Sequence, residues 1–316
     1  MKTVVVISGK GGTGKTTVVA SLAKITHQMD QRVVLADADV DASNLSLLLH
    51  PKAAPAIPFI GGEMVEVDPE ACNGCGLCIE HCRFDALQMI ETDDGSCVQV
   101  KEMSCEGCAV CTIVCPEKAL SMHDDVTGEW TLTTADTGPL VFAHLGVSGE
   151  NSGRLVTHVR SVAAAKAEEI GADILLIDGP PGTGCPVISA VTGVDLVLLV
   201  TEPTPPGISD LNRVLALARH FGIQAAVVIN KADLNPSLVR ELRADLVGQD
   251  VEVLGEIPYD EAVPRAQRLG VLPIDAENVV GQALRHIQNR LMVTLDGQPE
   301  SQRQKTSSDL QQEARQ

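Results

Sequence analysis

Aromatic residues are scarce in this 316-residue sequence, which contains four Phe, one Tyr and one Trp. Its core must therefore be built from Val, Leu, Ile and Ala, the usual filling of parallel sheets that are buried on both faces. Positive charge is also in short supply, since 24 Lys and Arg stand against 42 Asp and Glu and leave a formal charge of −18. Such a surface repels nucleic acid and anionic lipid, and few rings are present to stack on bases. The composition therefore argues against direct binding to DNA or RNA.

Long apolar runs are absent as well. No segment reaches the roughly 18 apolar residues that a membrane-spanning helix needs. The first three residues lead directly into an apolar run at residues 4–7, which is too short for a signal peptide. We therefore expect a cytoplasmic protein without membrane insertion. In that reducing compartment, the ten cysteines favour metal binding over disulfides.

Short apolar runs alternate with helical stretches along most of the chain. The predicted strands are residues 4–7, 33–36, 174–177, 196–200, 225–229 and 251–257. The predicted helices are residues 16–29, 154–170, 209–221 and 236–247. This alternation predicts right-handed βαβ crossovers and an α/β fold with a doubly wound, mostly parallel sheet.

Two regions interrupt the alternation. Residues 59–123 follow a Pro-rich stretch, contain most of the cysteines and hold 12 acidic but only 3 basic residues. We predict a small inserted α+β domain there, and a discontinuous sheet domain formed by residues 1–58 and 124–295. Residues 296–316 are rich in Gln, Ser and charge, which predicts a disordered polar tail.

A glycine-rich sequence, GKGGTGKTT at residues 9–17, follows the first predicted strand and opens the first predicted helix. In that setting glycine N–H groups can surround phosphates at a helix N-terminus. We expect Lys15 to reach the β- and γ-phosphates of a nucleotide and the Thr16 hydroxyl to bind Mg²⁺. The predicted nucleotide-binding residues of this loop are Gly11, Gly12, Thr13, Gly14, Lys15, Thr16 and Thr17.

Lys10 distinguishes this loop from an ordinary P-loop. With this lysine the sequence resembles the MinD/ParA/Mrp family of P-loop ATPases, which includes the nitrogenase iron protein, over residues 1–50 and 124–290. The resemblance implies that Lys10 crosses a dimer interface to the phosphates of the partner's nucleotide, and that the active unit is an ATP-dependent homodimer. A positive charge supplied in this way would stabilise the charge that develops on the transferred phosphoryl group.

Aspartates follow two further predicted strands. Asp37 and Asp39 resemble the family's switch I, and Asp178 resembles its switch II. The resemblance implies that Asp39 orients the attacking water, that Asp37 lies nearer the metal and that Asp178 holds Mg²⁺ through water. Two such sites at the carboxyl ends of strands, beside a P-loop, favour a functional role over helix capping. The predicted catalytic residues are thus Lys10, Lys15 and Asp39, and the predicted Mg²⁺ ligands are Thr16, Asp37 and Asp178.

The last two predicted strands lead to residues at family positions beside the base. We expect Asn230 to hydrogen-bond adenine, with Pro258 and Asp260 as further contacts. The string Asn-Lys-x-Asp at residues 230–233 also occurs in GTP-binding proteins, so the string alone leaves the base open. The switch sequences favour ATP.

Eight cysteines form two copies of the spacing C-x2-C-x2-C-x3-C, 33 residues apart. This is the pattern of bacterial two-cluster ferredoxins. Zinc is the alternative, but structural zinc sites use paired C-x2-C knuckles with four ligands per ion. A tight triple with a fourth cysteine at a fixed offset suits a 4Fe–4S cluster whose fourth ligand comes from the other motif. We therefore assign Cys72, Cys75, Cys78 and Cys115 to one cluster, and Cys105, Cys108, Cys111 and Cys82 to the other.

Two cysteines lie outside these motifs. Cys97, between the motifs, is expected to be a small core residue or a free thiol. Cys185 lies seven residues after Asp178, and in the nitrogenase iron protein a switch II cysteine at a similar offset holds a cluster that bridges the dimer. Residues 149–154 supply no second cysteine. Cys185 is therefore a candidate bridging ligand, with a buried cysteine that packs switch II as the favoured alternative.

Three functions remain open on the sequence, which resembles MinD-superfamily ATPases that carry an inserted ferredoxin domain. The first is an ATP-gated redox protein that binds Mg²⁺ and two 4Fe–4S clusters and acts on a redox partner protein. The second is an iron–sulfur carrier or assembly factor of the Mrp type. The third is a MinD/ParA-like positioning switch in which the clusters are structural. Eight cysteines that complete two clusters within one chain suit electron relay, so the first function is favoured.

Overall fold

The computed structural model describes residues 1–92, 95–101, 104–146 and 152–297. These residues form two compact units. The first contains residues 1–55, 130–144 and 152–297, and the second contains the described residues from 56 to 129 together with 145 and 146. The second unit thus extends beyond the predicted insert at both ends. Asp296 is the last residue of a helix rather than the first of a tail, and residues 298–316 of the predicted tail lie outside the described residues.

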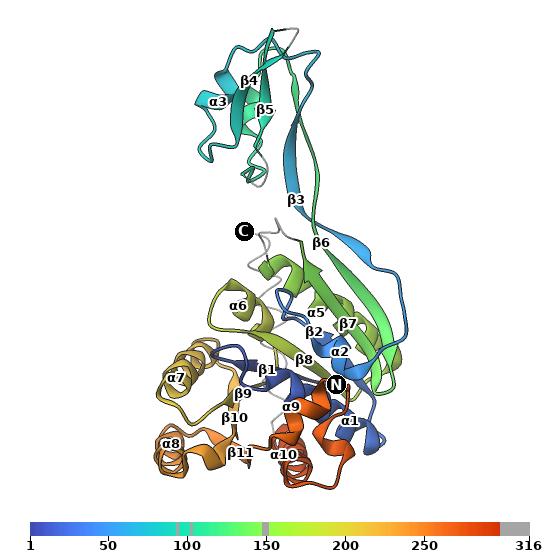
Figure 1. Ribbon diagram of the computed structural model, residues 1–316, viewed down its shortest axis with the longest axis vertical. Helices are drawn as coiled ribbons and strands as arrows, with labels where there is room; N and C mark the ends of the chain where they lie inside the picture. Colours follow the sequence, from blue (N-terminus) through green and yellow to red (C-terminus); the bar gives the residue numbers. More distant parts are fainter. Residues whose placement is uncertain (93–94, 102–103, 147–151, 298–316) are drawn as a thin grey trace. The chain divides into compact units, whose positions relative to one another are not determined.

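The first unit is an α/β structure (Figure 1). Its strands are β1 (Lys2–Ser8), β2 (Val33–Asp37), β7 (Gly138–Leu145), β8 (Ile174–Pro181), β9 (Leu196–Thr201), β10 (Gln224–Asn230), β11 (Glu252–Ile257) and the end of β6 (Leu120–Ala135). Its helices are α1 (Lys15–Gln28), α2 (Leu45–Leu49), α5 (Ser152–Ile170), α6 (Cys185–Val191), α7 (Pro205–His220), α8 (Pro236–Gly248), α9 (Ala262–Gln267) and α10 (Val279–Asp296), with the 3-10 helices η1 (Ala232–Leu234) and η2 (Pro273–Asp275). In the part of the chain that the structure describes, no helix has both the length and the apolar character that crossing a membrane requires.

The strands of the first unit follow the hydrogen-bonded order β11-β10-β9-β1-β8-β2-β7-β6. Parallel pairing joins β1 to β8 and β9, β2 to β7 and β8, and β10 to β9 and β11. Each of the six predicted strands is present, and the predicted α/β fold with a mostly parallel sheet is confirmed. This order places the carboxyl ends of β2, β8, β1, β9 and β10 next to one another along one edge of the sheet.

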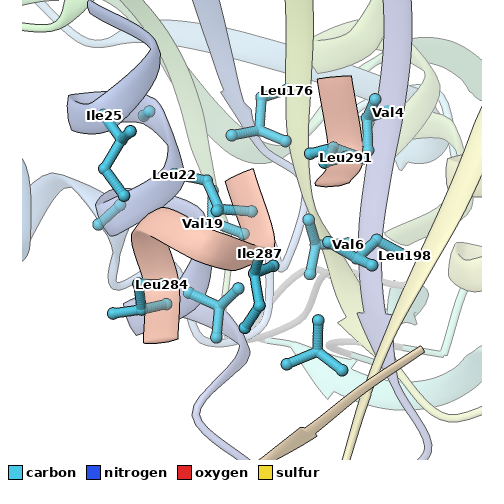
Figure 2. Close-up of a cluster of buried hydrophobic side chains, with 14 of the residues drawn as sticks. Val4, Val6, Val19, Leu22, Ile25, Leu176, Leu198, Leu284, Ile287 and Leu291 are labelled. Atoms are coloured by element: carbon cyan, nitrogen blue, oxygen red, sulfur yellow. The ribbon is translucent and has the colours of Figure 1, made fainter. Parts of the chain in front are cut away.

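One face of this sheet is buried beneath two helices from opposite ends of the chain. Val4 and Val6 of β1 are fully buried against α1 and α10 (Figure 2). Other members of this cluster are Val19, Leu22, Ile25, Leu176, Leu198, Leu284, Ile287 and Leu291. All of its fully buried side chains are aliphatic, as the scarcity of aromatic residues predicts.

The second unit combines short helices and strands around its own small core. It contains β3 (Ile57–Val67), α3 (Leu77–Glu80), β4 (Leu87–Thr92), β5 (Gly95–Val100), α4 (Val110–Val114) and the first part of β6. Strands β4 and β5 pair antiparallel. Buried Val65, Cys78, Leu87, Val98 and Leu120 form its core. The cysteines of both motifs therefore lie in a unit whose hydrophobic core is small.

Candidate functional site

The glycine-rich loop connects β1 to α1. Gly12 and Gly14 have positive φ angles of 79° and 89°, which residues with a side chain rarely adopt. Gly14 is also confined by a neighbour, because a Cβ atom there would lie 2.5 Å from Nδ2 of Asn230. The conformation of this loop therefore depends on glycine at both positions.

Asp37 and Asp178 end neighbouring strands and come together at the edge of the sheet. They are Cα partners in β2 and β8, and neither side chain has meaningful solvent exposure. Asp37 accepts hydrogen bonds from Ser43 Oγ at 2.8 Å and from the Leu45 N–H at 2.9 Å. Burial, together with the charge of Asp178, raises the pKa of Asp37 to about 7.

Lys15 supplies positive charge between the aspartates. Its Nζ lies 2.6 Å from Asp178 Oδ1 and 3.4 Å from Asp39 Oδ2. Burial lowers the pKa of Lys15, but the charges of Asp178 and Asp39 outweigh this effect and raise it. The lysine is therefore held as an ammonium group beside the loop that is predicted to bind phosphate.

The carboxylates also suit a magnesium ion. Asp178 Oδ2 is buried and has no hydrogen-bond partner among the described residues. Mg²⁺ is usually bound through one or two carboxylates, with phosphate oxygens and water as its remaining ligands. Asp178 and the neighbouring Asp37 could supply these one or two carboxylates. Thr16, the other predicted ligand, lines the same pocket as Lys15.

Two pockets border the glycine-rich loop. The larger, about 680 Å³ in volume, falls within the range of ligand-binding pockets. Its predicted site residues are Gly11, Gly12, Thr13, Gly14, Lys15, Thr16, Thr17 and Asp39. The smaller pocket is lined by Gly12, Gly14 and Thr17 together with the three predicted base contacts, Asn230, Pro258 and Asp260. Gln267 of α9, which the sequence analysis did not select, lines both pockets and donates a hydrogen bond to Thr17 Oγ1.

Asn230 connects the base-side pocket to the glycine-rich loop. Its Nδ2 donates to the Thr13 carbonyl at 2.7 Å, and its Oδ1 accepts from the Lys231 N–H at 2.9 Å. Asp260 Oδ1 accepts from the Ala262 N–H at 2.8 Å, at the beginning of α9. Asn230 and Asp260, two of the three predicted base contacts, thus also hold their own loops in place.

Lys10 pairs with another residue that the sequence analysis did not select. Its Nζ lies 3.3 Å from Glu202 Oε2, while Lys231 Nζ contacts the other carboxylate oxygen, Oε1. Burial raises the pKa of Glu202, but the two lysines outweigh this effect and lower it. Glu202 directly follows β9, so its position at a carboxyl strand end was the available signal.

A cavity in the second unit brings cysteines of both motifs together. Its lining includes Cys72, Cys75, Cys78 and Cys115, the set that the spacing assigns to one cluster. Burial raises the pKa of Cys72, but hydrogen bonds from the backbone of Val98 and Gly74 outweigh it and lower the pKa. The structure therefore favours the thiolate form of a predicted ligand.

The other predicted cysteine set is grouped in part. Cys105 and Cys111 pack against the core of the second unit, and burial together with the thiols of Cys105 and Cys108 raises the pKa of Cys111. No three His, Cys, Asp or Glu side chains in the described ranges are arranged to hold a single metal ion. The assignment of Cys105, Cys108, Cys111 and Cys82 to one cluster stays a prediction.

The last cysteine of each motif accepts a similar backbone hydrogen bond. The Ala86 N–H donates to Cys82 Sγ, and the Ala119 N–H donates to Cys115 Sγ, both at 3.3 Å. In each motif the donor lies four residues after the cysteine. The sequence repeat is therefore also a repeat of local structure.

The two remaining cysteines differ in exposure. Cys97 is buried, as expected of a core residue, and its thiol donates to the Val98 carbonyl at 3.4 Å. Cys185 is the first residue of α6 and is exposed rather than buried. Of the stretch 149–154, residues 149–151 lie outside the described residues. Gly153 lies near α6, since a Cβ there would be 3.2 Å from Ser189 Oγ.

Known proteins resemble this chain over most of its length. Residues 4–274 match the CobQ/CobB/MinD/ParA nucleotide binding domain. An uncharacterised protein of Methanocaldococcus jannaschii is 32% identical over 91% of this chain and 95% of its own. An iron-sulfur cluster carrier protein of the same organism is 23% identical over 94% of this chain and 86% of its own. The solved structure of the septum site-determining protein MinD of Pyrococcus horikoshii, complexed with Mg-ADP, has a TM-score of 0.57 and 20% identity, and the match covers 94% of this chain and 97% of that one. The fold is that of MinD-type P-loop ATPases.

Proposed function

We propose that this chain, which belongs to the CobQ/CobB/MinD/ParA family of nucleotide-binding domains, is an ATPase that couples its nucleotide state to electron transfer through two 4Fe–4S clusters. The cysteine cavity carries this proposal, because it combines Cys72, Cys75 and Cys78 of one motif with Cys115 of the other. In two-cluster ferredoxins, each cysteine motif likewise supplies one ligand to the cluster that the other motif binds. The working form is a homodimer that interacts with a redox partner protein.

The residues around the glycine-rich loop would divide the work of ATP hydrolysis. Backbone N–H groups of residues 11–17 bind the phosphates, and Lys15 exchanges its carboxylate partners for the β- and γ-phosphates. Asp39, within 3.4 Å of the Lys15 ammonium group, orients the attacking water. Thr16, Asp37 and Asp178 would hold Mg²⁺, which neutralises phosphate charge when bound. The smaller pocket receives adenine beside Asn230, Pro258 and Asp260.

Lys10 would act on the nucleotide of a second copy of the chain. Its side chain is 39% exposed, whereas that of Lys15 is 6% exposed, so the two lysines of the loop differ in their access to another molecule. A second copy would then receive a positive charge as negative charge develops on its transferred phosphoryl group. Hydrolysis would depend on dimer formation for this reason.

The residues that line the cysteine cavity support the proposal that a cluster binds there. A 4Fe–4S cluster binds each of its four thiolates through a different iron, so its ligands surround a cavity rather than converge on one point. The cavity has four cysteines in its lining, and the N–H of Ala119 already donates to one of their sulfurs. Hydrogen bonds to sulfur are among the features that set the reduction potential of such a cluster. When bound, the two clusters would accept and release single electrons.

Anaerobic purification followed by electron paramagnetic resonance tests this function. After reduction we expect the signals of two 4Fe–4S clusters, and a change in those signals when Mg-ATP is added. A protein that binds ATP but takes up no iron when it is reconstituted with iron and sulfide would reject the electron-transfer function. Only the ATPase activity would then remain of the proposal.

A carrier of iron–sulfur clusters is the second candidate. The similarity to an iron-sulfur cluster carrier protein favours it. A carrier must release its cluster, whereas a relay must retain it. Incubation of the loaded protein with a cluster-free ferredoxin separates the two, because transfer of iron accelerated by ATP supports the carrier and retention of both clusters supports the relay.

A further inference from the structure

Glu202 connects the glycine-rich loop to the loop that follows β10. Its two carboxylate oxygens contact different lysines, Lys10 at 3.3 Å and Lys231 by a hydrogen bond. The backbone around Glu202 is also fixed, since the Thr204 N–H donates to its carbonyl at 2.8 Å. Gly207 closes this turn, because a Cβ there would lie 2.6 Å from the same carbonyl. Glu202 is therefore held in place between β9 and α7.

Two lysines contact Glu202, and one of them is enough to keep its carboxylate paired. The Glu202 side chain is 11% exposed, so its charge needs a partner. If Lys10 leaves, Lys231 still occupies the other oxygen, and no unpaired charge remains inside the protein. Lys10 can therefore move at the cost of a single, partly exposed ion pair.

Such a pair limits what Lys10 can do for another chain. One ammonium group cannot stay on Glu202 and also reach the phosphates of a second copy's nucleotide. A triphosphate carries more negative charge than a diphosphate, so it competes better for the ammonium group. The strength of the Glu202 pair thus determines how readily the lysine changes partner.

We propose that Glu202 restrains Lys10 within its own chain, so that a second copy carrying ATP must displace Glu202 before the two copies pair productively. This inference rests on the proposed role of Lys10 in a dimer and adds the residue that regulates it. Glu202 is a positioning residue here, because it acts through Lys10 and not on the nucleotide.

The single chain provides a test that does not depend on dimer formation. Lys10 is acetylated with a limiting amount of an amine-reactive reagent in nucleotide-free protein, and the modified peptide is quantified by mass spectrometry. Glu202→Gln should label Lys10 about two- to fivefold faster than the wild type, the range expected for loss of a partly exposed ion pair. Exposed Lys52 serves as the internal reference. Equal labelling of Lys10 in both proteins would overturn the restraint.

A matched variant removes the ion pair between Lys231 and Glu202. Lys231→Met leaves Glu202 with Lys10 as its remaining lysine, so labelling of Lys10 should stay at or below the wild-type rate. Faster labelling of Lys10 in this variant would mean that the whole loop has loosened, and would overturn a specific role for Glu202. This variant keeps the proposal testable if Glu202→Gln fails to fold.

Sedimentation velocity with Mg²⁺ and a non-hydrolysable ATP analogue tests the effect on pairing. Glu202→Gln should lower the protein concentration at half-dimerisation about two- to fivefold when Lys10 is present, and the double variant with Lys10→Ala should stay monomeric. Weaker pairing of Glu202→Gln than of the wild type would make Glu202 an interface contact and overturn the proposal.

The two proposals fail in different ways. If Lys10→Ala dimerises as the wild type does, the role of Lys10 in the partner's site is wrong, and Glu202 has no control over pairing. If Lys10→Ala stays monomeric while Glu202→Gln alters neither labelling nor pairing, the proposed dimer stands and the restraint by Glu202 is wrong.

Discussion

Asp37 and Asp178 are Cα partners in adjacent parallel strands, and both carboxyl groups are buried at the edge of the sheet that carries the glycine-rich loop. Lys15 lies 2.6 Å from Asp178 and supplies one positive charge to a site that contains several carboxylates. The nucleotide-free site therefore has more negative than positive charge. A magnesium ion that arrives with a nucleotide would correct this imbalance.

The raised pKa of Asp37 gives the nucleotide-free protein a pH-dependent stability. The pKa rises from 3.8 to about 7, so between these values the folded protein retains a proton that the unfolded chain has released. The contribution of Asp37 to the free energy of unfolding therefore falls as the pH rises through this window. Asp37→Asn should show a smaller decrease in Tm across it, as measured by calorimetry without nucleotide.

Asp41→Asn is a suitable control for this prediction, because Asp41 is an exposed aspartate in the same loop. Its Tm should follow the wild-type pH dependence. Parallel Tm curves for Asp37→Asn and the wild type would show that Asp37 does not titrate in this window.

Lys15 should contribute to stability as well as to nucleotide binding. Lys15→Met removes the partner of buried Asp178, which typically costs about 3–5 kcal/mol. The same variant should lose measurable ATP binding in calorimetry. Lys24→Met breaks the exposed pair with Asp275 and should cost no more than about 1 kcal/mol. Equal losses in chemical denaturation would contradict the buried role of Lys15.

Lys10→Ala should separate nucleotide binding from hydrolysis. The variant keeps Lys15 and both pockets, so it should bind ATP as a monomer. Its turnover should fall at least about a hundredfold, the usual cost of losing one group that stabilises transition-state charge. An ATP-dependent dimer with wild-type turnover, by sedimentation and phosphate release, would contradict the role assigned to Lys10.

The convergence of the nucleotide site was predictable from the sequence because parallel strands end at a common edge. Asp37, Asp178 and Asn230 each follow an apolar run that can be read as a strand, and this places them without knowledge of side-chain contacts. Glu202 occupies the same kind of position, but its pairing with Lys10 depends on how the loops fold. A contact between residues so far apart in the chain leaves no periodic signal.

The sequence analysis did not predict β6 or α10, and each omission has a physical reason. β6 contains several Thr residues that alternate with other side chains, so it lacks the continuous apolar run of the central strands. α10 buries Leu284, Ile287 and Leu291 on one side, but it follows the last predicted strand, where no further strand requires a crossover helix. In the second unit, cysteine spacing grouped four cysteines that line one cavity, whereas the hydrogen bonds to sulfur required the structure.

The metal content of the second unit can be predicted from its cysteines. The purified protein should contain about eight iron atoms and eight acid-labile sulfides per chain, as two 4Fe–4S clusters require. Cys115→Ser should lose about half of this iron, because the cavity places Cys115 with Cys72, Cys75 and Cys78. Cys97→Ser should keep all of it. About two zinc ions per chain after anaerobic reconstitution would contradict the cluster assignment.

We predict that the nucleotide state controls the proposed clusters. The chain passes from α2, which follows Asp37 and Asp39, to the second unit, and the γ-phosphate orders the switch segments of other nucleotide hydrolases. Cluster potentials depend on exposure and on hydrogen bonds to sulfur. A shift of about 60 mV in a one-electron couple corresponds to about 1.4 kcal/mol, which lies within the usual range of coupling between two sites.

Potentiometric titration monitored by electron paramagnetic resonance, with no nucleotide, with ADP and with Mg-ATP, tests this claim most directly. We predict that Mg-ATP shifts the midpoint potential of at least one cluster by about 60 mV, and that Asp39→Ala retains the shifted value because it binds ATP without hydrolysing it. Midpoint potentials that are identical in all three nucleotide states would contradict the coupling and leave the ATPase and the clusters as independent functions.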